Sequence, residues 1–463
     1  MKQTNNVYEG ENRSLHMKER IGYGVGDFAN NMMYAPVNSF FTYFLTNVAG
    51  LGAGIVGTIL LLSRLMDGVS DLIVGTFMEK IHSKHGKARP WLLWWCVPFA
   101  VSLVLMFSAP DFGTTGKIVY AFLTYNLAVT VVYTAINLPF GSLAALMTKN
   151  QTERGYLNIS KMVFAFGGGM VVNALTLPLV KYFGNDSSAW MKTFVIYGAV
   201  AVVLFLVVFF TTKEAVTEEA EKNDTVEKVN ISEALKSLVN NKYWLILLAI
   251  FFLNSVVNAF IGVNVYYAQF IMKDDSLVGS LSIFQNIASF VAFAMCTAII
   301  RKAGKQKIAI AGVAISFVGY AMVLVNPTSY AVLYTAAVVK GIGNAALSGV
   351  MYGMLADTVE YNDWNSGIRA EGLVFSANSI GQKIGSGIGS AILGWVLAGF
   401  GFVSSSAIQP DSAINGIRMI FLYVPIVVFA IMFVILLFYK LDEEYGGIVK
   451  ELEARAEKKN AQK

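Results

Sequence analysis

The chain has 463 residues, of which 56% are hydrophobic and 14% charged, and its mean hydropathy is +0.57. This composition is too apolar for a soluble protein of this size, which excludes soluble enzymes and soluble binding domains. The formal net charge is only +5, and no basic cluster is interleaved with exposed aromatic residues, so no nucleic-acid partner is expected. The sequence predicts an integral membrane protein in a lipid bilayer.

Hydrophobic stretches long enough to cross a hydrocarbon core of roughly 30 Å recur along nearly the whole chain. They lack the period-two alternation of outer-membrane strands, and helices are the other way to satisfy every backbone group in lipid. The predicted fold class is therefore all-α, with twelve transmembrane helices. The predicted spans are residues 21–49, 52–79, 91–109, 117–148, 156–182, 190–212, 243–272, 276–300, 308–325, 329–357, 373–400 and 415–438.

The positions of lysine and arginine predict the orientation of these spans. With both termini inside, the cytoplasmic stretches hold 26 of the 35 basic residues and the outer loops hold five, as the positive-inside rule expects. The first twenty residues are polar, so we expect no cleavable signal peptide and a first span that acts as the insertion signal. The expected location is the plasma (inner) membrane, with many spans and both termini cytoplasmic.

A polar segment rich in Glu and Lys, residues 213–242, divides the predicted spans six and six. The sequence therefore predicts an N-terminal six-helix bundle (1–212), a cytoplasmic linker (213–242), a C-terminal six-helix bundle (243–440) and a cytoplasmic tail (441–463). Apolar residues recur at helical spacing within the linker, which predicts a short amphipathic helix at the cytoplasmic surface, and a solvated tether between the halves accounts for the rest of the segment. These residues are Ile231, Ala234, Leu235 and Leu238.

Three ionisable residues, Arg64, Asp67 and Asp71, lie inside the otherwise apolar second span. Their positions i, i+3 and i+7 share one helix face, where they can meet each other and a water-filled cavity rather than lipid. Two carboxylates beside one guanidinium can bind and release a cation, because one acid stays ionised while the other shares Na⁺ or H⁺. The alternative is an ion network that only ties helices together; the cost of burying an acid pair favours a cation site.

The fourth span carries Thr134 and Asn137 one turn apart, and these supply neutral oxygens. Na⁺ favours carboxylate, hydroxyl and amide oxygens, so the two residues could complete the site begun by the two acids. A hydrogen bond between helices is the alternative use for such a polar pair.

No metal cofactor or redox centre is predicted. Cys96 and Cys296 both lie in predicted spans and indicate neither a disulfide framework nor a metal site. His16, His82 and His85 all lie in cytoplasmic stretches, so proton chemistry within the membrane would use carboxylates.

Two basic cytoplasmic loops lie at matching positions in the two halves, between spans two and three and between spans eight and nine. The first runs from Lys80 to Pro90 and the second from Arg301 to Lys307. Such a match suggests a duplicated architecture, although topology signalling alone would also place basic residues there.

One further polar segment runs from Ala356 to Gly372, ahead of Lys383 in the eleventh span. With it, the chain resembles the glycoside–pentoside–hexuronide:cation symporter family, of major-facilitator fold, over essentially its whole length. The motifs that carry the resemblance, in chain order, are Tyr23-Gly-Val-Gly26-Asp27-Phe-Ala-Asn30-Asn31, the helix with Arg64, Asp67 and Asp71, Gly86-Lys87-Ala88-Arg89-Pro90, Asn137-Leu-Pro139-Phe-Gly-Ser142, and Ala356 to Gly372 ahead of Lys383.

The resemblance implies import of a glycoside down a cation gradient, by alternating access of two pseudo-symmetric six-helix bundles around a central site. It implies H⁺ or Na⁺ as the coupling ion, no other cofactor, and a monomer as the expected state. By matching motif, the cation-binding residues are Asp67, Asp71, Thr134 and Asn137. The residues expected to bind substrate are Asp27, Asn31, Tyr133, Asn137, Lys161, Tyr352 and Lys383, with Arg64 and Lys340 as coupling or structural charges.

Counting charges inside the spans suggests the substrate. Four bases (Arg64, Lys161, Lys340, Lys383) stand against three acids (Asp27, Asp67, Asp71). If Arg64 and the coupling cation balance the acid pair, Lys161 and Lys383 remain to face a negative group, and a carboxylated sugar would supply one.

The motifs point in the same direction. The run from Gly26 to Asn31 and the asparagine ahead of Pro139 resemble the glucuronide carriers of the family more than its melibiose branch, in which the positions of Asn31 and Asn137 are acidic. We therefore expect a hexuronide or glucuronide, with a neutral pentoside or galactoside as the alternative. Because Asn137 replaces an acid, the local negative charge is smaller, which favours H⁺ over Na⁺.

Two other functions compete with transport. Paired Asp residues on a membrane helix also hold Mg²⁺ in prenyl and head-group transferases, but those enzymes need a second acidic motif near the interface, which this sequence lacks. A sugar sensor without transport could use the same fold, and the sequence alone does not exclude it.

Overall fold

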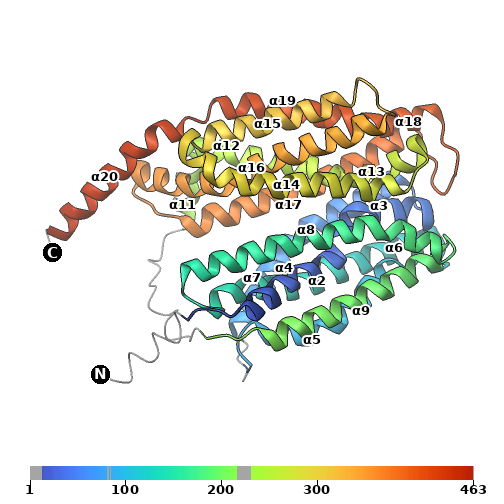
Figure 1. Ribbon diagram of the computed structural model, residues 1–463, viewed down its shortest axis with the longest axis horizontal. Helices are drawn as coiled ribbons and strands as arrows, with labels where there is room; N and C mark the ends of the chain where they lie inside the picture. The colour runs from blue at the N-terminus through green and yellow to red at the C-terminus, as the bar shows by residue number, and fades with distance from the viewer. Residues whose placement is uncertain (1–12, 81–82, 84, 216–230, 462–463) are drawn as a thin grey trace. The chain divides into compact units, whose positions relative to one another are not determined.

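The computed structural model describes residues 13–80, 83, 85–215 and 231–461, and helices make up its regular elements (Figure 1). The first elements in chain order are α2 (Met17–Ser39), α3 (Phe41–Tyr43), η1 (Phe44–Val48), α4 (Ala53–Lys80), α5 (Arg89–Met106), α6 (Thr114–Tyr125), η2 (Asn126–Tyr133), α7 (Thr134–Met147), α8 (Gln151–Tyr182) and α9 (Ser187–Thr211). The remaining elements are α11 (Ile231–Val239), α12 (Lys242–Ala259), η3 (Phe260–Gly262), α13 (Val263–Tyr266), η4 (Tyr267–Met272), α14 (Ser276–Ala303), α15 (Lys305–Met322), α16 (Tyr330–Ser366), α17 (Glu371–Gly399), α18 (Asp411–Arg418), η5 (Met419–Tyr423), α19 (Val424–Leu437) and α20 (Leu441–Ala461).

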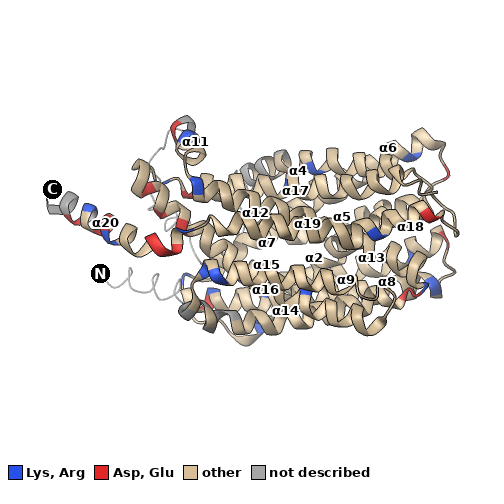
Figure 2. Ribbon diagram, turned by 90° about the horizontal axis from the view of Figure 1, so that it is seen from above, with Lys and Arg blue, Asp and Glu red and all other residues tan. Residues whose placement is uncertain are grey.

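Eight helical stretches in these ranges are long and apolar enough to cross a membrane. They are Arg89–Met106, Thr114–Met147, Gln151–Tyr182, Ser187–Thr211, Lys242–Met272, Ser276–Met295, Tyr330–Ser366 and Asp411–Leu437. Helices α2, α4, α15 and α17 are of comparable length. In Figure 2 the middles of the helices are mostly uncharged, and charged residues gather near the helix ends. The predicted all-helical membrane protein is confirmed.

Several helices extend beyond the bounds that hydropathy predicts. Helix α16 continues past residue 357 to Ser366 and ends at Gly367, whose φ of 71° is the left-handed conformation that glycine adopts without strain. Helix α8 begins before residue 156, at Gln151, because the side chain of Asn150 accepts hydrogen bonds from the backbone N–H groups of Thr152 and Glu153. The helical content of the polar loops is therefore larger than expected. The short linker helix is confirmed as α11.

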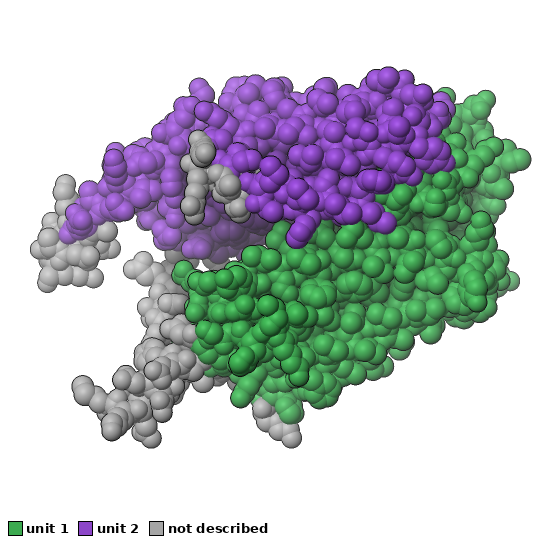
Figure 3. Space-filling view, in the orientation of Figure 1, with its two compact units in different colours: residues 1–225, 261–282, 390–417 green, residues 226–260, 283–389, 418–463 purple. Residues whose placement is uncertain are grey.

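The chain divides into two compact units (Figure 3). Unit 1 comprises residues 1–225, 261–282 and 390–417, and unit 2 comprises residues 226–260, 283–389 and 418–463. The predicted bundles, 1–212 and 243–440, were divided at the polar linker. Unit 1, by contrast, also includes residues 261–282 and 390–417, which belong to the second predicted bundle. The bundle boundaries therefore stay a prediction.

Glycine allows close packing inside unit 1. A Cβ at Gly168 of α8 would lie 3.2 Å from the carbonyl oxygen of Phe28 in α2, so these two helices approach nearly backbone to backbone. Helices α4 and α17 do the same: a Cβ at Gly57 would lie 2.9 Å from the carbonyl oxygen of Ala391, and one at Gly394 would collide with the carbonyl of Ala53. Unit 1 therefore joins the beginning of α4 to the end of α17.

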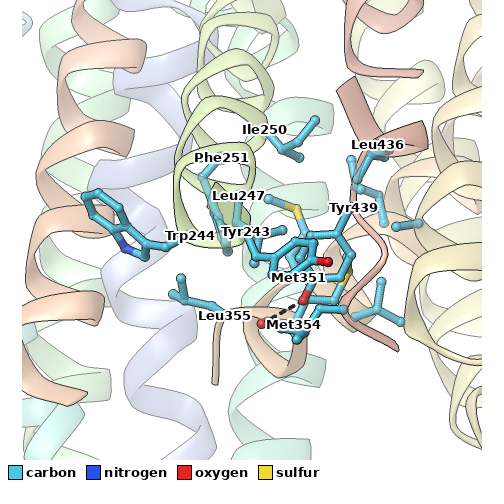
Figure 4. Packing of buried hydrophobic residues seen from close by; sticks show 14 of the residues in the cluster. Tyr243, Trp244, Leu247, Ile250, Phe251, Met351, Met354, Leu355, Leu436 and Tyr439 are labelled. Carbon is cyan, nitrogen blue, oxygen red and sulfur yellow. Dashed lines mark hydrogen bonds between the residues drawn. The ribbon is translucent and has the colours of Figure 1, made fainter. Parts of the chain in front are cut away.

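Unit 2 has a core of large apolar side chains from α12, α16 and the end of α19 (Figure 4). Leu247 and Phe251 of α12 contribute to this cluster together with Met351 and Met354 of α16. Tyr439, which follows α19, donates its hydroxyl hydrogen to the carbonyl oxygen of Met354 at 3.2 Å, so its one polar atom is satisfied inside the cluster. This core holds the helix ends that carry the Ala356 to Gly372 motif.

Candidate functional site

Asp67 lies buried in α4 and contacts a threonine that the sequence did not single out. The hydroxyl of Thr130 in η2 donates a hydrogen bond to Oδ1 of Asp67 at 2.5 Å, and both residues are 4% exposed. On the other carboxylate oxygen, Nη1 of Arg64 lies 3.4 Å from Oδ2. A buried carboxylate needs such donors, because an unpaired charge in a low-dielectric interior is costly.

A hydrogen-bonded chain extends from Thr130 to Asn126 and Ser63. The amide of Asn126 donates to Oγ of Ser63 at 2.8 Å and to the carbonyl oxygen of Phe122 at 2.7 Å. Both hydrogens of this amide are therefore used, and its oxygen lies 3.1 Å from the Thr130 hydroxyl, whose single hydrogen has this oxygen and Oδ1 of Asp67 as its two acceptors. Asp67 thus lies at the end of a polar network that connects α4 with η2.

The guanidinium of Arg64 reaches a second helix. Its Nη2 donates to the side-chain oxygen of Asn38 in α2 at 3.3 Å, and the side chains of Tyr34 and Tyr125 lie nearby. Arg64 therefore joins α2 to the Asp67 network, in a part of the chain where a charge without partners would be expensive.

The other predicted cation ligands lie on the same elements. Thr134 is buried at the start of α7, one turn beyond Thr130, and Asn137 is half-buried in the same helix. Asp71 belongs to α4, but its side chain lies outside the described residues. The roles of Asp71, Thr134 and Asn137 in cation binding stay predictions.

Helices α2, α7 and α8 bring together the predicted sugar residues of unit 1. The ring of Phe140 stacks on Tyr23 with 4.8 Å between centroids, and the ammonium of Lys161 lies 5.5 Å from the centre of that same ring. Asp27 is half-buried and within Coulombic range of Lys161. Asn31 donates to the backbone oxygen of Asp27 at 2.9 Å. These side chains form one polar and aromatic group.

Tyr133 also belongs to unit 1, at the end of η2. Its ring stacks on that of Tyr34 of α2, with 6.1 Å between centroids, and Tyr34 is half exposed. The role of Tyr133 in substrate binding stays a prediction.

Unit 2 contains the remaining predicted residues. Tyr352 of α16 is exposed and meets Phe251 edge to face at 5.2 Å, and Lys383 is half-buried in α17. Lys340 is buried, with its ammonium 4.7 Å from the ring centre of Tyr320 and 5.4 Å from that of Phe421. Cation–π contacts therefore surround Lys340, which fits a structural role better than contact with substrate.

The Ala356 to Gly372 motif organises the end of unit 2. Asp357 forms an ion pair with Lys305 of α15, with both carboxylate oxygens 2.6 Å from the ammonium. The indole of Trp364 donates to Glu451 of α20 at 2.6 Å. The motif thus ties α16 to α15 and to the C-terminal helix.

Sequence reasoning missed Ser63, Asn126 and Thr130. A usable signal was present: Ser63, Asp67 and Asp71 are spaced by four residues, and so are Asn126, Thr130 and Thr134. Two such series on neighbouring helices indicate polar faces that can meet.

Comparison with known proteins agrees with this geometry. A family model described as MFS/sugar transport protein matches residues 22–443. The isoprimeverose transporter of Lactiplantibacillus pentosus is 33% identical over 450 residues, covering 96% of this chain and 92% of that protein. The putative glycoside/cation symporter YagG of Escherichia coli (strain K12) is 32% identical over 444 residues, 95% of each chain. The glucuronide carrier protein homolog of the same strain is 30% identical over 452 residues, 96% of this chain and 97% of that protein.

Solved structures agree at the level of the fold. A D-xylose-proton symporter superposes with a TM-score of 0.63 at 11% identity, covering 93% of this chain and 98% of that chain. The nucleoside transporter NupG gives a TM-score of 0.64 at 12% identity, covering 92% and 100%. The chain is a membrane transporter and not an enzyme, and it belongs to the MFS/sugar transport protein family, among the glycoside–pentoside–hexuronide:cation symporters that its motifs resemble.

Proposed function

We propose that this protein is a secondary active transporter that imports a glycoside together with a cation, by alternating access. In this proposal α2, α4, α15 and α17 cross the membrane together with the eight apolar stretches, which gives twelve spans in two pseudo-symmetric six-helix bundles. Both termini face the cytoplasm of a cell whose inner membrane holds the protein as a monomer. The distribution of basic residues supports this orientation.

The observation that carries the proposal is the buried carboxylate of Asp67. It lies in a helix of a symporter-family member, with Arg64 on one oxygen and Thr130 on the other. Ionisable residues inside membrane helices commonly mark ion pathways and proton relays, which makes this acid the first candidate for a cation site. Asp71, Thr134 and Asn137 are the further ligands that we propose.

Coupling follows from linkage. A cation at Asp67 and Asp71 stabilises the state that binds sugar, and sugar raises the affinity for the cation by the same factor. The coupling ion is H⁺ or Na⁺. The neutral side chain of Asn137 keeps the local negative charge small, which favours H⁺.

We propose a hexuronide or glucuronide as the substrate. The carboxylate of such a sugar would pair with Lys161 of unit 1 or Lys383 of unit 2, and Asp27, Asn31, Tyr133, Asn137 and Tyr352 would contact hydroxyl groups or the ring face. The glucuronide carrier homolog among the relatives supports this choice.

A neutral pentoside is the second candidate, and one electrostatic relationship favours it. The positive charge of Lys161 acts on Asp27, so the carboxylate of a hexuronide would compete with an acid of unit 1 for this lysine. The isoprimeverose transporter among the relatives is consistent with this alternative.

The test is counterflow of labelled sugar in proteoliposomes, across a panel of glucuronides, xylosides and galactosides, with and without Na⁺ and with a protonophore. Exchange across a sealed membrane is expected, and neither an enzyme nor a sensor would produce it. Asp67→Asn should abolish uphill uptake and leave the protein folded. Concentrative uptake by this variant would reject the cation assignment, and preference for neutral pentosides over glucuronides would select the second candidate.

A further inference from the structure

Glu214, at the start of the linker, is hydrogen-bonded to the end of the loop between α4 and α5. The carboxylate of Glu214 accepts three hydrogen bonds from consecutive backbone N–H groups: those of Lys87 at 2.7 Å, Ala88 at 3.0 Å and Arg89 at 2.8 Å. These three N–H groups lie at the start of α5, where the first N–H groups of a helix have no hydrogen-bond acceptor within the helix. Glu214 therefore caps α5 from a position just beyond α9.

Gly86 makes this contact possible. Its φ of 105° is a conformation that side chains rarely adopt, and a Cβ at this position would collide with the carboxyl group of Glu214. The loop sequence and the acid are therefore matched to each other.

Arg89 adds a second connection between the same two helix ends. Its Nη2 donates to the carbonyl oxygen of Phe209 in α9 at 2.6 Å, and its guanidinium lies 4.7 Å from the centre of the Phe209 ring. The carbonyl groups in the last turn of a helix also lack partners within the helix. The start of α5 and the end of α9 thus satisfy each other's free backbone groups.

The same arrangement recurs in unit 2. Gly304, with φ of 82°, precedes α15, and the backbone N–H of Gln306 donates to Oδ2 of Asp442, which follows α19, at 2.7 Å. The side chain of Gln306 donates to the carbonyl oxygen of Leu436 in α19 at 3.2 Å. A Cβ at Gly304 would lie 3.1 Å from Asp442. Gly304, Gln306 and Asp442 therefore correspond in role to Gly86, Arg89 and Glu214.

We propose that Glu214 and Asp442 are matched positioning residues for the conformational step of transport. Each acid locks the start of one helix to the end of another, α5 to α9 in unit 1 and α15 to α19 in unit 2. These helix pairs also pack along their length. Each pair therefore moves as one body, and the polar segments after α9 and α19 begin from a fixed point.

This role is separate from the binding of substrate or cation. Glu214 and Asp442 lie outside the membrane-spanning stretches, on the polar ends of their units, and neither contacts Asp67 or the proposed sugar residues among the contacts of the described chain. A positioning role predicts that loss of the acid slows conversion between states and leaves the affinity for sugar unchanged.

The test compares equilibrium binding with counterflow in proteoliposomes, using 4-nitrophenyl β-D-glucuronide, or 4-nitrophenyl β-D-xyloside if the panel selects it. Glu214→Ala should lower the counterflow rate by about tenfold, because three hydrogen bonds to a charged acceptor are lost, with a Kd within about twofold of the original. Glu214→Gln, which keeps the shape of the side chain, should lose less. Glu453→Ala, which removes an exposed acid of α20, is the matched control and should change neither quantity.

Gly86→Ala disrupts the same contact, because its methyl group would collide with the carboxyl group of Glu214. This variant should also show a slower counterflow rate with an unchanged Kd. Glu214→Ala removes the atoms that the methyl group of Gly86→Ala would strike. The counterflow rate of the variant with both substitutions should therefore fall by less than the product of the fold-decreases of the two single variants. Asp442→Ala should reproduce the effect in unit 2.

Hydrogen exchange supplies a readout that does not need the substrate. The amides of Lys87, Ala88 and Arg89 should exchange faster in Glu214→Ala than in the unmodified protein. The inference relies on the proposed function only for its transport readout: absence of counterflow in the unmodified protein would reject that function. Unchanged exchange at these amides, unchanged counterflow in Glu214→Ala, or a fall in rate matched by a weaker Kd would overturn the inference itself.

Discussion

Thr130 and Asp67 form a short contact between η2 and α4, with 2.5 Å between the hydroxyl oxygen and Oδ1. The side chain of Asp67 is buried, so this hydroxyl replaces a water molecule as a donor to the carboxylate. The pair is the direct link between the two helices on which the proposed cation ligands lie.

We therefore expect Thr130→Val, which keeps the shape and removes the hydroxyl, to lower the free energy of unfolding by about 2 kcal/mol. Cation-driven uptake should fall as well, because the carboxylate loses its fixed position. Thermal unfolding in detergent and counterflow measure the two effects. Thr124→Val is the matched control, because the hydroxyl of Thr124 donates to the backbone oxygens of Tyr120 and Ala121 in its own helix. Equal behaviour of the two variants would contradict the assignment.

The ion pair between Lys305 and Asp357 leads to a second prediction. The Asp357 side chain is 7% exposed, so Lys305→Met leaves a buried carboxylate without its cation and should cost about 3 kcal/mol. The double variant Lys305→Met with Asp357→Leu should recover most of this loss, because no charge stays buried. Melting temperatures of the single and double variants decide the matter, and a double variant less stable than Lys305→Met would argue against a simple ion pair.

Close packing of α4 on α17 leads to a third prediction. Gly394→Val places side-chain atoms against the carbonyl of Ala53 and should force the two helices apart, with a lower melting temperature and loss of counterflow. Gly399→Ala in the same helix is the control, because a Cβ there meets no atom within 4 Å. The prediction fails if both variants transport equally well.

The start of α9 supplies a prediction on pH. Asp186 is the N-cap, and its carboxylate accepts hydrogen bonds from the backbone N–H of Ala189 at 2.7 Å and from the hydroxyl of Ser188 at 2.9 Å. These bonds, the backbone one first, hold the pKa of Asp186 below its usual value of 3.8. A depressed pKa means that the folded state gains stability above pH 3.8 and loses that gain as the pH falls through the lower folded value.

The difference in melting temperature between the unmodified protein and Asp186→Ala should therefore be constant near neutral pH and shrink in acid below the usual pKa. Asp186→Asn keeps an N-cap side chain without the charge. Its melting temperature at neutral pH should therefore lie closer to that of the unmodified protein than the melting temperature of Asp186→Ala does. A difference that stays constant into acid would show that the charge of Asp186 does not contribute.

The sequence was sufficient to predict the helices, because composition and hydropathy act over twenty residues at a time. It also identified Asp67 and Arg64, since a charge inside an apolar span is conspicuous. It did not identify Thr130, because a neutral hydroxyl in a membrane helix more often bonds to its own backbone. That choice is visible here in Thr124 and Thr176, which donate to oxygens four residues earlier.

Glu214 was missed for a different reason. In the sequence it is one of several Glu residues in a polar linker, and its partners are backbone N–H groups more than a hundred residues away. Every residue except proline has the same backbone N–H group, so the sequence does not show which residues act as backbone donors. Of the residues in this contact, Gly86, with its positive φ, could have indicated a special conformation. The matching basic loops suggested a duplicated architecture, but they did not point to the acids that cap the helices after them.

The wide π-helical turn of η2 has a consequence for the length of the chain. It accommodates one residue more than an α-helix of equal rise would hold. A variant that lacks Val131 could run as α-helix from α6 into α7, with almost the same hydropathy and span length. Because the lost residue is the extra one, the segments on either side of the deletion would keep nearly the same orientation. Thr130 and Thr134 would then stand three residues apart, a spacing that still places both side chains on one face of an α-helix, so the polar face of this span would survive the loss of a residue.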